Sequence, residues 1–326
     1  MHPAFSVIFL TTLIGVGQGL FLALYTGQLY SLANLLPAQE SRSFYALGSL
    51  IAVAFLIGGL IASFFHLGHP ERAWRAASQW RTSWLSREVI VLPVAMALIL
   101  LYAALHFIGW TGPWFTVAGV LPVDATLIVG GLAAAAVLLL FVCTAMIYAC
   151  LKFLQEWHSW LTVANYLLLG SASGFVLAAA FSAWQGAELV GFYGAWAAII
   201  TVAAFVTRGA SLIRNRRLRH KSNPQTAIGV RHNRIVQMAQ GATGGTFNTR
   251  EFFHHRPVEV ITGIRRAFLV LVFPLPVVLL ALAYLTASPT LPILAFVLQY
   301  LGLMAERWYF FAEAKHPQNL YYQYVS

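Results

Sequence analysis

Charged side chains are scarce in this chain. Asp, Glu, Lys and Arg make up 9% of its 326 residues, whereas a soluble globular protein carries about 25%. Apolar residues make up 60%, and the mean hydropathy is +0.73. This composition excludes a disordered chain and an ordinary soluble enzyme, and it leaves an integral membrane protein.

Cysteine is also nearly absent, since the chain has only Cys143 and Cys150. Two thiolates cannot by themselves build an iron–sulfur cluster or a cysteine-rich zinc site. Both lie in one apolar segment, and we predict that they share a helix face as small core residues. We expect no metal site in this chain.

Long apolar runs recur along the whole sequence. A helix needs about 20 predominantly apolar residues to cross a bilayer, and these runs are continuous rather than alternating, which favours helices over strands. We therefore predict an all-α integral membrane protein, a single polytopic domain over residues 1–326, with eight transmembrane helices. The eight spans are expected at about 6–32, 44–65, 89–108, 125–151, 161–181, 189–206, 267–285 and 291–311.

Acidic residues number 10 against 20 Lys and Arg, and all the basic residues except Arg42 fall on one side of the predicted spans. The positive-inside rule places that side in the cytoplasm. We therefore expect both termini and the main loops there, including a long basic loop at 207–266 between the sixth and seventh helices. The net charge of +10 is then explained by topology, and we expect no nucleic-acid partner.

Formally charged residues are rare inside the predicted spans, where the only Asp, Glu, Lys or Arg residues are Glu306 and Arg307. Secondary transporters usually place ionisable groups at mid-membrane depth and often show an internal repeat. Neither feature is evident here, which weighs against a transporter. A secondary transporter nevertheless remains the competing class of function, and a purely structural tether is a further alternative.

The first basic loop has a distinctive order of residues. The second span is predicted to end at His66, Gly68 is suited to a left-handed C-terminal cap, and Pro70 can begin a short interfacial helix. Ser86 is predicted as the N-cap of the third span, with Glu88 in its first turn.

His66, Arg72 and Glu88 are therefore expected to converge at the membrane interface, an arrangement that suits a quinone headgroup. Quinone redox chemistry moves two electrons and two protons, and a histidine with a nearby carboxylate can exchange protons near neutral pH. A structural alternative stays open, in which His66 only caps helix carbonyls and Glu88 only serves the helix dipole.

Bound haem b is not expected. A haem between helices normally requires two histidines at matching depth, and His66, His106 and His158 offer no obvious pair. The glycines of residues 240–255 fit neither a P-loop nor a dinucleotide fingerprint. We interpret that segment as a docking loop.

Four segments together resemble the membrane-anchor subunit of the dimethyl sulfoxide reductase family. They are residues 66–73, 83–88, 246–252 and 306–314, and the resemblance extends over nearly the whole chain. It implies that the protein anchors a molybdopterin catalytic subunit and a four-cluster iron–sulfur subunit and exchanges electrons with membrane quinone. The molybdopterin and the clusters would lie only in those partners.

The resemblance also implies roles for individual residues. His66, Gly68 and Arg72 match the family residues implicated in quinol binding, and Glu88 matches the acidic residue that opens the third span. We therefore predict His66, Gly68, Arg72 and Glu88 as the quinone-binding residues, with His66 and Glu88 carrying the protons. In the docking loop we predict that Asn248 and Arg250 contact the partner.

Orientation separates two branches of this resemblance. In dimethyl sulfoxide reductase itself the catalytic subunits are periplasmic, whereas the motif loops here are predicted to be cytoplasmic. In this respect the chain is similar to the anchor of cytoplasmic sulfite dehydrogenase. We expect an anchor in the lipid of the bacterial cytoplasmic (inner) membrane that passes electrons to ubiquinone or menaquinone during sulfite oxidation. The alternative is a quinol-oxidising anchor of a dimethyl sulfoxide or related terminal reductase.

Overall fold

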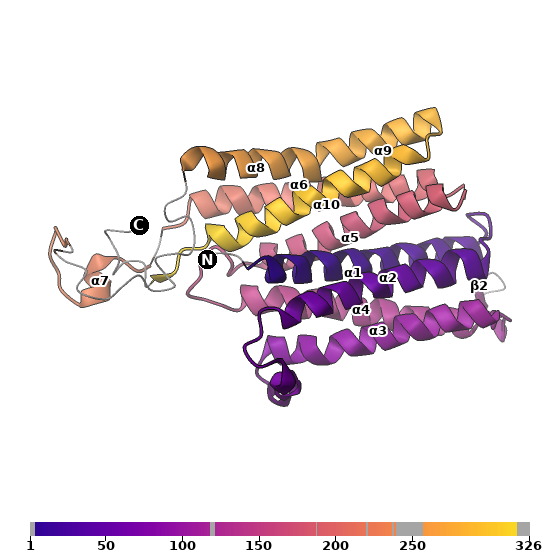
Figure 1. The fold of residues 1–326 in the computed structure, drawn as a ribbon, viewed down its shortest axis with the longest axis horizontal. Coiled ribbons are helices and arrows are strands. Elements are labelled where there is room, and N and C mark those ends of the chain that lie inside the picture. Colours follow the sequence, from indigo (N-terminus) through magenta and orange to yellow (C-terminus); the bar gives the residue numbers. More distant parts are fainter. Residues whose placement is uncertain are drawn as a thin grey trace.

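The protein forms an elongated helical bundle. The computed structural model describes residues 4–117, 121–186, 188–219, 221–236, 238 and 257–317. Long helices run side by side and alternate in direction, and the short elements lie at the two ends of the bundle (Figure 1). Among the described residues the only strands form one short hairpin, so the all-α prediction is confirmed.

The helices and strands have the following bounds. The long helices are α1 (Phe5–Leu32), α2 (Leu47–Phe64), α3 (Trp84–Ile108), α4 (Ala125–Ala149), α5 (Trp160–Trp184), α6 (Val190–Arg216), α8 (Val258–Val272), α9 (Pro274–Thr286) and α10 (Thr290–Glu313). The short elements are the π-helical turn η1 (Ser41–Ala46), the 3-10 helix η2 (Pro70–Gln79), strands β1 (Phe115–Val117) and β2 (Leu121–Val123), and α7 (Pro224–Ile228).

Seven helical segments of the described chain are long and apolar enough to cross a membrane, with η1 and α2 forming one segment and α8 and α9 another. The eighth predicted span forms α10, which has 24 residues but is not in that set. Glu306 and Arg307 lie inside α10 and lower its hydropathy. The prediction of eight transmembrane helices is therefore confirmed for seven of them.

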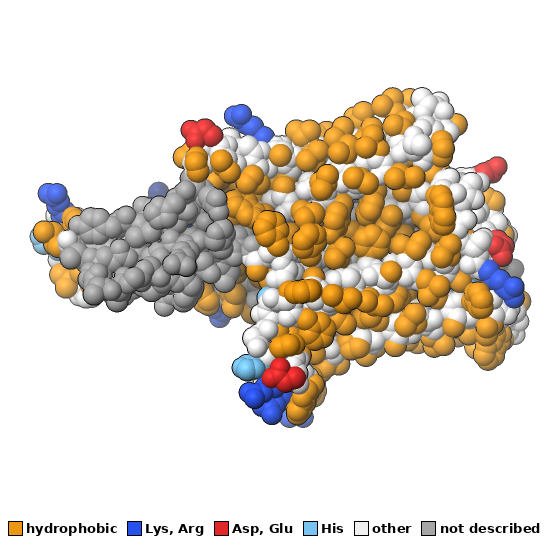
Figure 2. Space-filling model, in the orientation of Figure 1, with side chains coloured by type: hydrophobic (Ala, Val, Ile, Leu, Met, Phe, Trp, Pro, Cys, Tyr) orange, Lys and Arg blue, Asp and Glu red, His pale blue; other side chains and the backbone are white. Residues whose placement is uncertain are grey.

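Charge and apolar surface are separated along the bundle. Orange hydrophobic side chains cover its flank, and the charged side chains gather at its ends (Figure 2). The first described residues, η2, α7 and the end of α10 lie at one end (Figure 1). We call it the basic end, since it carries Arg72, Arg87, Lys152 and Arg216. The β1–β2 hairpin marks the opposite end.

Helices α1 and α5 are the most buried spans, and they meet without intervening side chains. A Cβ atom added to Gly174 would overlap the backbone of Gly19, and one added to Gly19 would overlap Gly170. Close approach of small residues is the usual basis of helix association in lipid, where the hydrophobic effect does not favour helix–helix contact. This contact holds α1 in the centre of the bundle.

Several local predictions are wrong. Helix α2 ends at Phe64 rather than His66, and Gly68 is not among the left-handed residues. Ser83, not Ser86, is the N-cap of α3, because its hydroxyl accepts a hydrogen bond from the Ser86 amide at 3.3 Å. Of the two cysteines, Cys143 is buried as predicted, but Cys150 is exposed at the end of α4.

The earlier start of α3 changes the position of Glu88. With Trp84 as the first helical residue, Glu88 lies in the second turn of α3 and is buried. Helix α6 likewise continues beyond its predicted end to Arg216, which places Arg208 inside a helix and buries it. Both residues add ionisable groups to the helices that the predicted spans did not contain.

Candidate functional site

The connection between α2 and α3 forms an exposed platform at the basic end. Pro70 begins the 3-10 helix η2, as predicted, and η2 contains no buried residue. Glu71 lies between two neighbours, 3.1 Å from Nδ1 of His69 and 3.5 Å from Nε of Arg72. All three side chains are more than half exposed, so these pairs contribute little to stability.

Tryptophan and arginine alternate around this platform. Each of three guanidinium groups lies over a neighbouring indole ring: Arg75 over Trp74 at 5.5 Å, Arg81 over Trp80 at 5.3 Å and Arg87 over Trp84 at 4.2 Å. Tryptophan is enriched at the lipid headgroup level of membrane proteins, and arginine binds its ring through cation–π attraction. The platform thus has the composition of a membrane–water interface.

His66 lies just beyond the end of α2, with its side chain exposed. Partial desolvation lowers the pKa of this imidazole from its ordinary value of 6.5, and a hydrogen bond with the Ala62 backbone opposes that shift. At neutral pH the ring is therefore mostly uncharged, so one ring nitrogen can donate a hydrogen bond while the other accepts. Such a ring can exchange a proton with a ligand oxygen.

Glu88 faces the interior of the bundle. Its Oε1 accepts a hydrogen bond of 2.5 Å from the hydroxyl of Thr144 on α4. A carboxylate in an apolar interior requires such a donor, because an unpartnered buried charge is strongly disfavoured. Within the described residues, no hydrogen bond or ion pair joins Glu88 to His66 or Arg72.

The predicted residues therefore share one end of the bundle but not one contact network. His66 and Arg72 are on the exposed side, and Glu88 is on the buried side. Gly68 is exposed, and a Cβ added to it would meet nothing within 4 Å, so its backbone is open to the surroundings. Convergence of these residues on one ligand stays a prediction.

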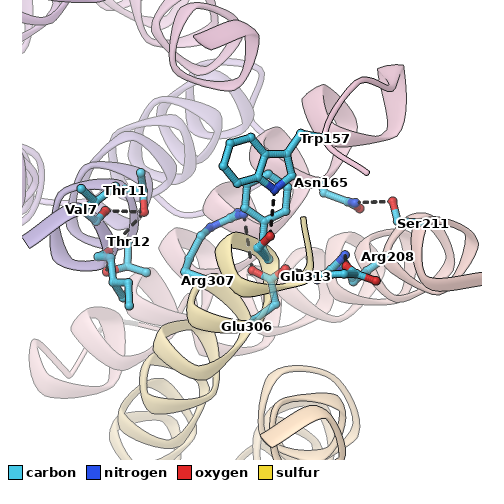
Figure 3. Close-up of polar contacts among 12 residues, drawn as sticks. Val7, Thr11, Thr12, Trp157, Asn165, Arg208, Ser211, Glu306, Arg307 and Glu313 are labelled. Carbon is cyan, nitrogen blue, oxygen red and sulfur yellow. Dashed lines mark hydrogen bonds and ion pairs between the residues drawn. The ribbon is translucent and has the colours of Figure 1, made fainter. Parts of the chain in front are cut away.

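A buried set of ion pairs connects α6 with α10. Arg208 Nε lies 2.7 Å from Glu306 Oε1, and Arg208 Nη1 lies 3.8 Å from Glu313 Oε2. Arg307 Nη1 lies 3.4 Å from the other oxygen of Glu306. Figure 3 shows Glu306 between the two arginines, with Glu313 beside Arg208. We call these four residues the charge cluster.

Sequence reasoning found only part of the charge cluster. Glu306 and Arg307 are visible as the two charges of an apolar segment, but Arg208 follows an apolar run and is easily assigned to the next loop. Because α6 continues for about two turns beyond Arg208, this residue lies inside the helix and is only 1% exposed. An arginine close after an apolar run, opposite a lone acidic residue in another, is the signal that identifies such a pair.

A small, mostly apolar cavity with a few polar side chains in its wall lies between α1, α4, α5 and α10. Its volume is about 20 Å³, and its polar lining comes from Thr11, Thr12, Gln18, Thr144, Tyr166, Ser173 and Arg307. The Arg307 guanidinium lies 3.9 Å from the centre of the Tyr166 ring. Thr144 thus contacts both Glu88 and this cavity.

Comparison with known proteins places the chain in a family. The family model described as the dimethyl sulfoxide reductase anchor subunit matches residues 1–322. The chain belongs to this family. A curated relative, a sulfite dehydrogenase subunit of Allochromatium vinosum, is 64% identical over 326 residues, which cover 100% of both chains.

Membership of the dimethyl sulfoxide reductase anchor family confirms the predicted resemblance. The protein is a membrane anchor subunit of this family's type and a multi-pass membrane protein. Family membership also argues against a transporter more strongly than the small number of charges in the spans, since Glu88 and Arg208 add to that number. Asn248 and Arg250, the predicted docking residues of this anchor, lie outside the described residues.

The three histidines weighed as haem ligands lie on different parts of this anchor. His66 lies at the basic end, and His106 is buried in the last turn of α3 at the opposite end. His158 lies between α4 and α5, with Nδ1 2.6 Å from the Ala149 carbonyl oxygen. No group of three or more potential metal ligands occurs in the part of the chain that the structure describes.

Proposed function

We propose that this anchor carries the quinone-reactive site of a sulfite dehydrogenase complex in the bacterial inner membrane. In this proposal a molybdopterin subunit oxidises sulfite, a four-cluster iron–sulfur subunit carries the electrons, and the anchor passes them to ubiquinone or menaquinone. Similarity over the full length to a relative named as a sulfite dehydrogenase subunit supports the proposal.

One structural observation carries the quinone assignment. At the basic end, a buried carboxyl group (Glu88, on α3) and an exposed, mostly neutral imidazole (His66, just beyond α2) come from consecutive parts of the chain. Reduction of a quinone requires a hydrogen-bond donor for its carbonyl oxygens and two protons from water. His66 supplies a donor in contact with the aqueous phase, and Glu88 supplies a proton-carrying group inside the bundle.

The orientation of the complex follows from charge. The basic end faces the cytoplasm under the positive-inside rule, so the partner subunits dock there and the protons for quinone reduction come from the cytoplasm. The exposed Arg72 side chain orients the quinone headgroup or the partner subunit. The reverse reaction, quinol oxidation by a terminal reductase anchor, would use the same residues. The two directions of electron flow are distinguished by whether the catalytic subunit oxidises or reduces its substrate.

The test is a comparison of two histidines in membranes that contain the whole complex. His66→Gln is expected to lower sulfite-dependent quinone reduction by about 100-fold or more, since a positioned acid–base group contributes roughly 10²–10⁴ in rate. Sulfite oxidation with ferricyanide as acceptor should stay unchanged, because that reaction bypasses the anchor. His69→Gln, which changes an exposed neighbour, is the matched control and should retain quinone reduction.

A normal rate of quinone reduction in His66→Gln would overturn the site assignment. Co-purification tests the anchor role itself: the tagged protein, extracted in mild detergent, should carry a molybdopterin subunit and an iron–sulfur subunit. Purification of the anchor alone from cells that express all the subunits would contradict that role.

A further inference from the structure

His66 and Glu88, the predicted proton-carrying residues, do not contact each other. Protons must therefore reach Glu88 by a path of its own. His66 is exposed and can exchange protons with water directly. Glu88 is buried, with 7% of its surface exposed, and its hydrogen bond leads away from His66 to Thr144. If Glu88 delivers a proton to a ligand, it must receive the next proton from the side of Thr144.

We propose that Thr144 and a water molecule in the adjacent cavity form the relay that reprotonates Glu88. This inference rests on the proposed quinone function and assigns Thr144 and Arg307 as positioning residues for the same reaction. Neither residue is expected to contact quinone.

The cavity suits one water molecule. Its volume of about 20 Å³ exceeds the roughly 10–15 Å³ that a single water requires. A buried water also needs two to four polar partners. Thr144, Thr11, Thr12 and Arg307 all line this space, and Figure 3 places Thr11 and Thr12 on the side of Arg307 away from Arg208.

Arg307 makes that water a better proton donor. A fixed positive charge beside a water stabilises the negative charge that remains when the water gives up a proton. The Arg307 guanidinium is held in place by the ring of Tyr166 at 3.9 Å and by Glu306 at 3.4 Å. Arg208, bound to the other Glu306 oxygen, keeps Glu306 from moving towards the cavity.

A quinone receives two electrons from the partner's iron–sulfur cluster and two protons, one through His66 and one from the carboxyl group of Glu88. The Thr144 hydroxyl then gives its proton to the Glu88 carboxylate along the 2.5 Å hydrogen bond and takes a proton from the cavity water. A proton passed inward from water at the basic end converts the remaining cavity hydroxide back to water, so the net proton comes from the cytoplasm.

The relay is tested by removing the hydroxyl group of Thr144. Thr144→Val keeps the shape of the side chain and deletes the donor, whereas Thr144→Ser keeps the hydroxyl. In membranes with the whole complex, Thr144→Val is expected to lower kcat for sulfite-dependent quinone reduction by about tenfold or more, because proton transfer becomes limiting. The KM for quinone should stay unchanged, the solvent deuterium isotope effect should rise, and Thr144→Ser should restore both kcat and the isotope effect.

Thr201→Val is the matched control, since Thr201 is a buried threonine of α6 that does not line the cavity. It should leave kcat, KM and the isotope effect unchanged. A Thr144→Val complex with the wild-type kcat and isotope effect would overturn the relay, and so would a Thr144→Ser complex that shows the same loss as Thr144→Val.

A second readout does not depend on turnover. In acid-induced infrared difference spectra of the complex, the carboxyl band that is lost in Glu88→Gln should shift in Thr144→Val and return in Thr144→Ser. An unshifted band would contradict the hydrogen bond on which the relay depends. Normal quinone reduction in His66→Gln together with a shifted band would refute the quinone site while leaving the Glu88–Thr144 contact intact.

Discussion

The two ends of the bundle bury polar groups in different ways. At the basic end, the charge cluster pairs ions of opposite sign, as in Arg208 with Glu306. At the opposite end, a chain of hydrogen bonds runs from the Tyr102 hydroxyl to Gln28, then to Thr126 and to the carboxyl group of Asp124. Asp124 is the N-cap of α4 and accepts a backbone amide.

This difference shows how each end tolerates a buried charge. The carboxyl group of Asp124 needs no cation, because the amides and the dipole at a helix N-terminus stabilise it. Glu306 lies far inside α10, where no free amide is available, and it requires the two arginines. The basic end therefore depends on both members of each ion pair, whereas the opposite end depends on hydrogen bonds and has, among the described residues, no cation partner for its carboxyl group.

The largest expected effect is the loss of one cation from the charge cluster. Arg208→Met leaves Glu306 buried without its 2.7 Å partner, and breaking a buried pair costs about 3–5 kcal/mol of unfolding free energy. We expect a marked fall in Tm of the detergent-purified complex. Arg42→Met, which changes an exposed arginine at the opposite end, is the control. An equal fall in Tm in the two variants would contradict the proposed difference between the ends.

A smaller effect is expected from one neutral hydrogen bond at the opposite end. Tyr102→Phe removes the 2.8 Å donor to Gln28, which should cost about 1 kcal/mol. Thermal unfolding should show this modest loss, and quinone reduction should be normal because Tyr102 lies far from the basic end. A loss as large as that of Arg208→Met would show that the opposite end is as sensitive as the basic end.

His106 is a buried residue of the opposite end whose replacement is expected not to lower stability. His106 is 2% exposed, its ring packs against Tyr45 and Tyr102, and neither ring nitrogen has a hydrogen-bond partner among the described residues. His106→Phe removes buried polar atoms without removing a bond. We expect an unchanged or slightly raised Tm and unchanged quinone reduction; a clear loss of either would indicate a role for this imidazole.

The smallest expected effect depends on pH. Because desolvation lowers the pKa of His66 in the folded protein, the unfolded chain binds more protons once the pH falls below about 6.5. The contribution of His66 to stability is therefore complete above that pH and is lost as the pH falls through the folded pKa. Between about pH 7.5 and 5.5, the wild-type Tm should fall slightly more than that of His66→Gln. A steeper fall in the variant would contradict this sign.

Sequence predicts the helices well because crossing a bilayer imposes one length and one composition. It predicts their ends poorly. The apolar runs place Arg208 and Glu88 at or beyond span ends, but arginine side chains and capping serines allow helices to continue past the apolar run, as α6 does to Arg216 and α3 does from Trp84.

The candidate site is predictable only as a set of residues. His66, Arg72 and Glu88 are identifiable by residue type and order, but the direction in which Glu88 points is not. Helix α3 is apolar on all sides, so no polar stripe indicates which face meets α4. The contact between Glu88 and Thr144 joins two helices and can be seen only once they are packed.

The contact of α1 with α5 has a mechanical consequence. Gly19 and Gly174 bring the two backbones together, so no flexible side chain lies between the helices to absorb a displacement. Helix α1 supplies Thr11 and Thr12 to the wall of the cavity beside Arg307, and α5 supplies Tyr166. The spacing of these walls is therefore set by rigid main chain rather than by rotamers, and the cavity should have a low compressibility.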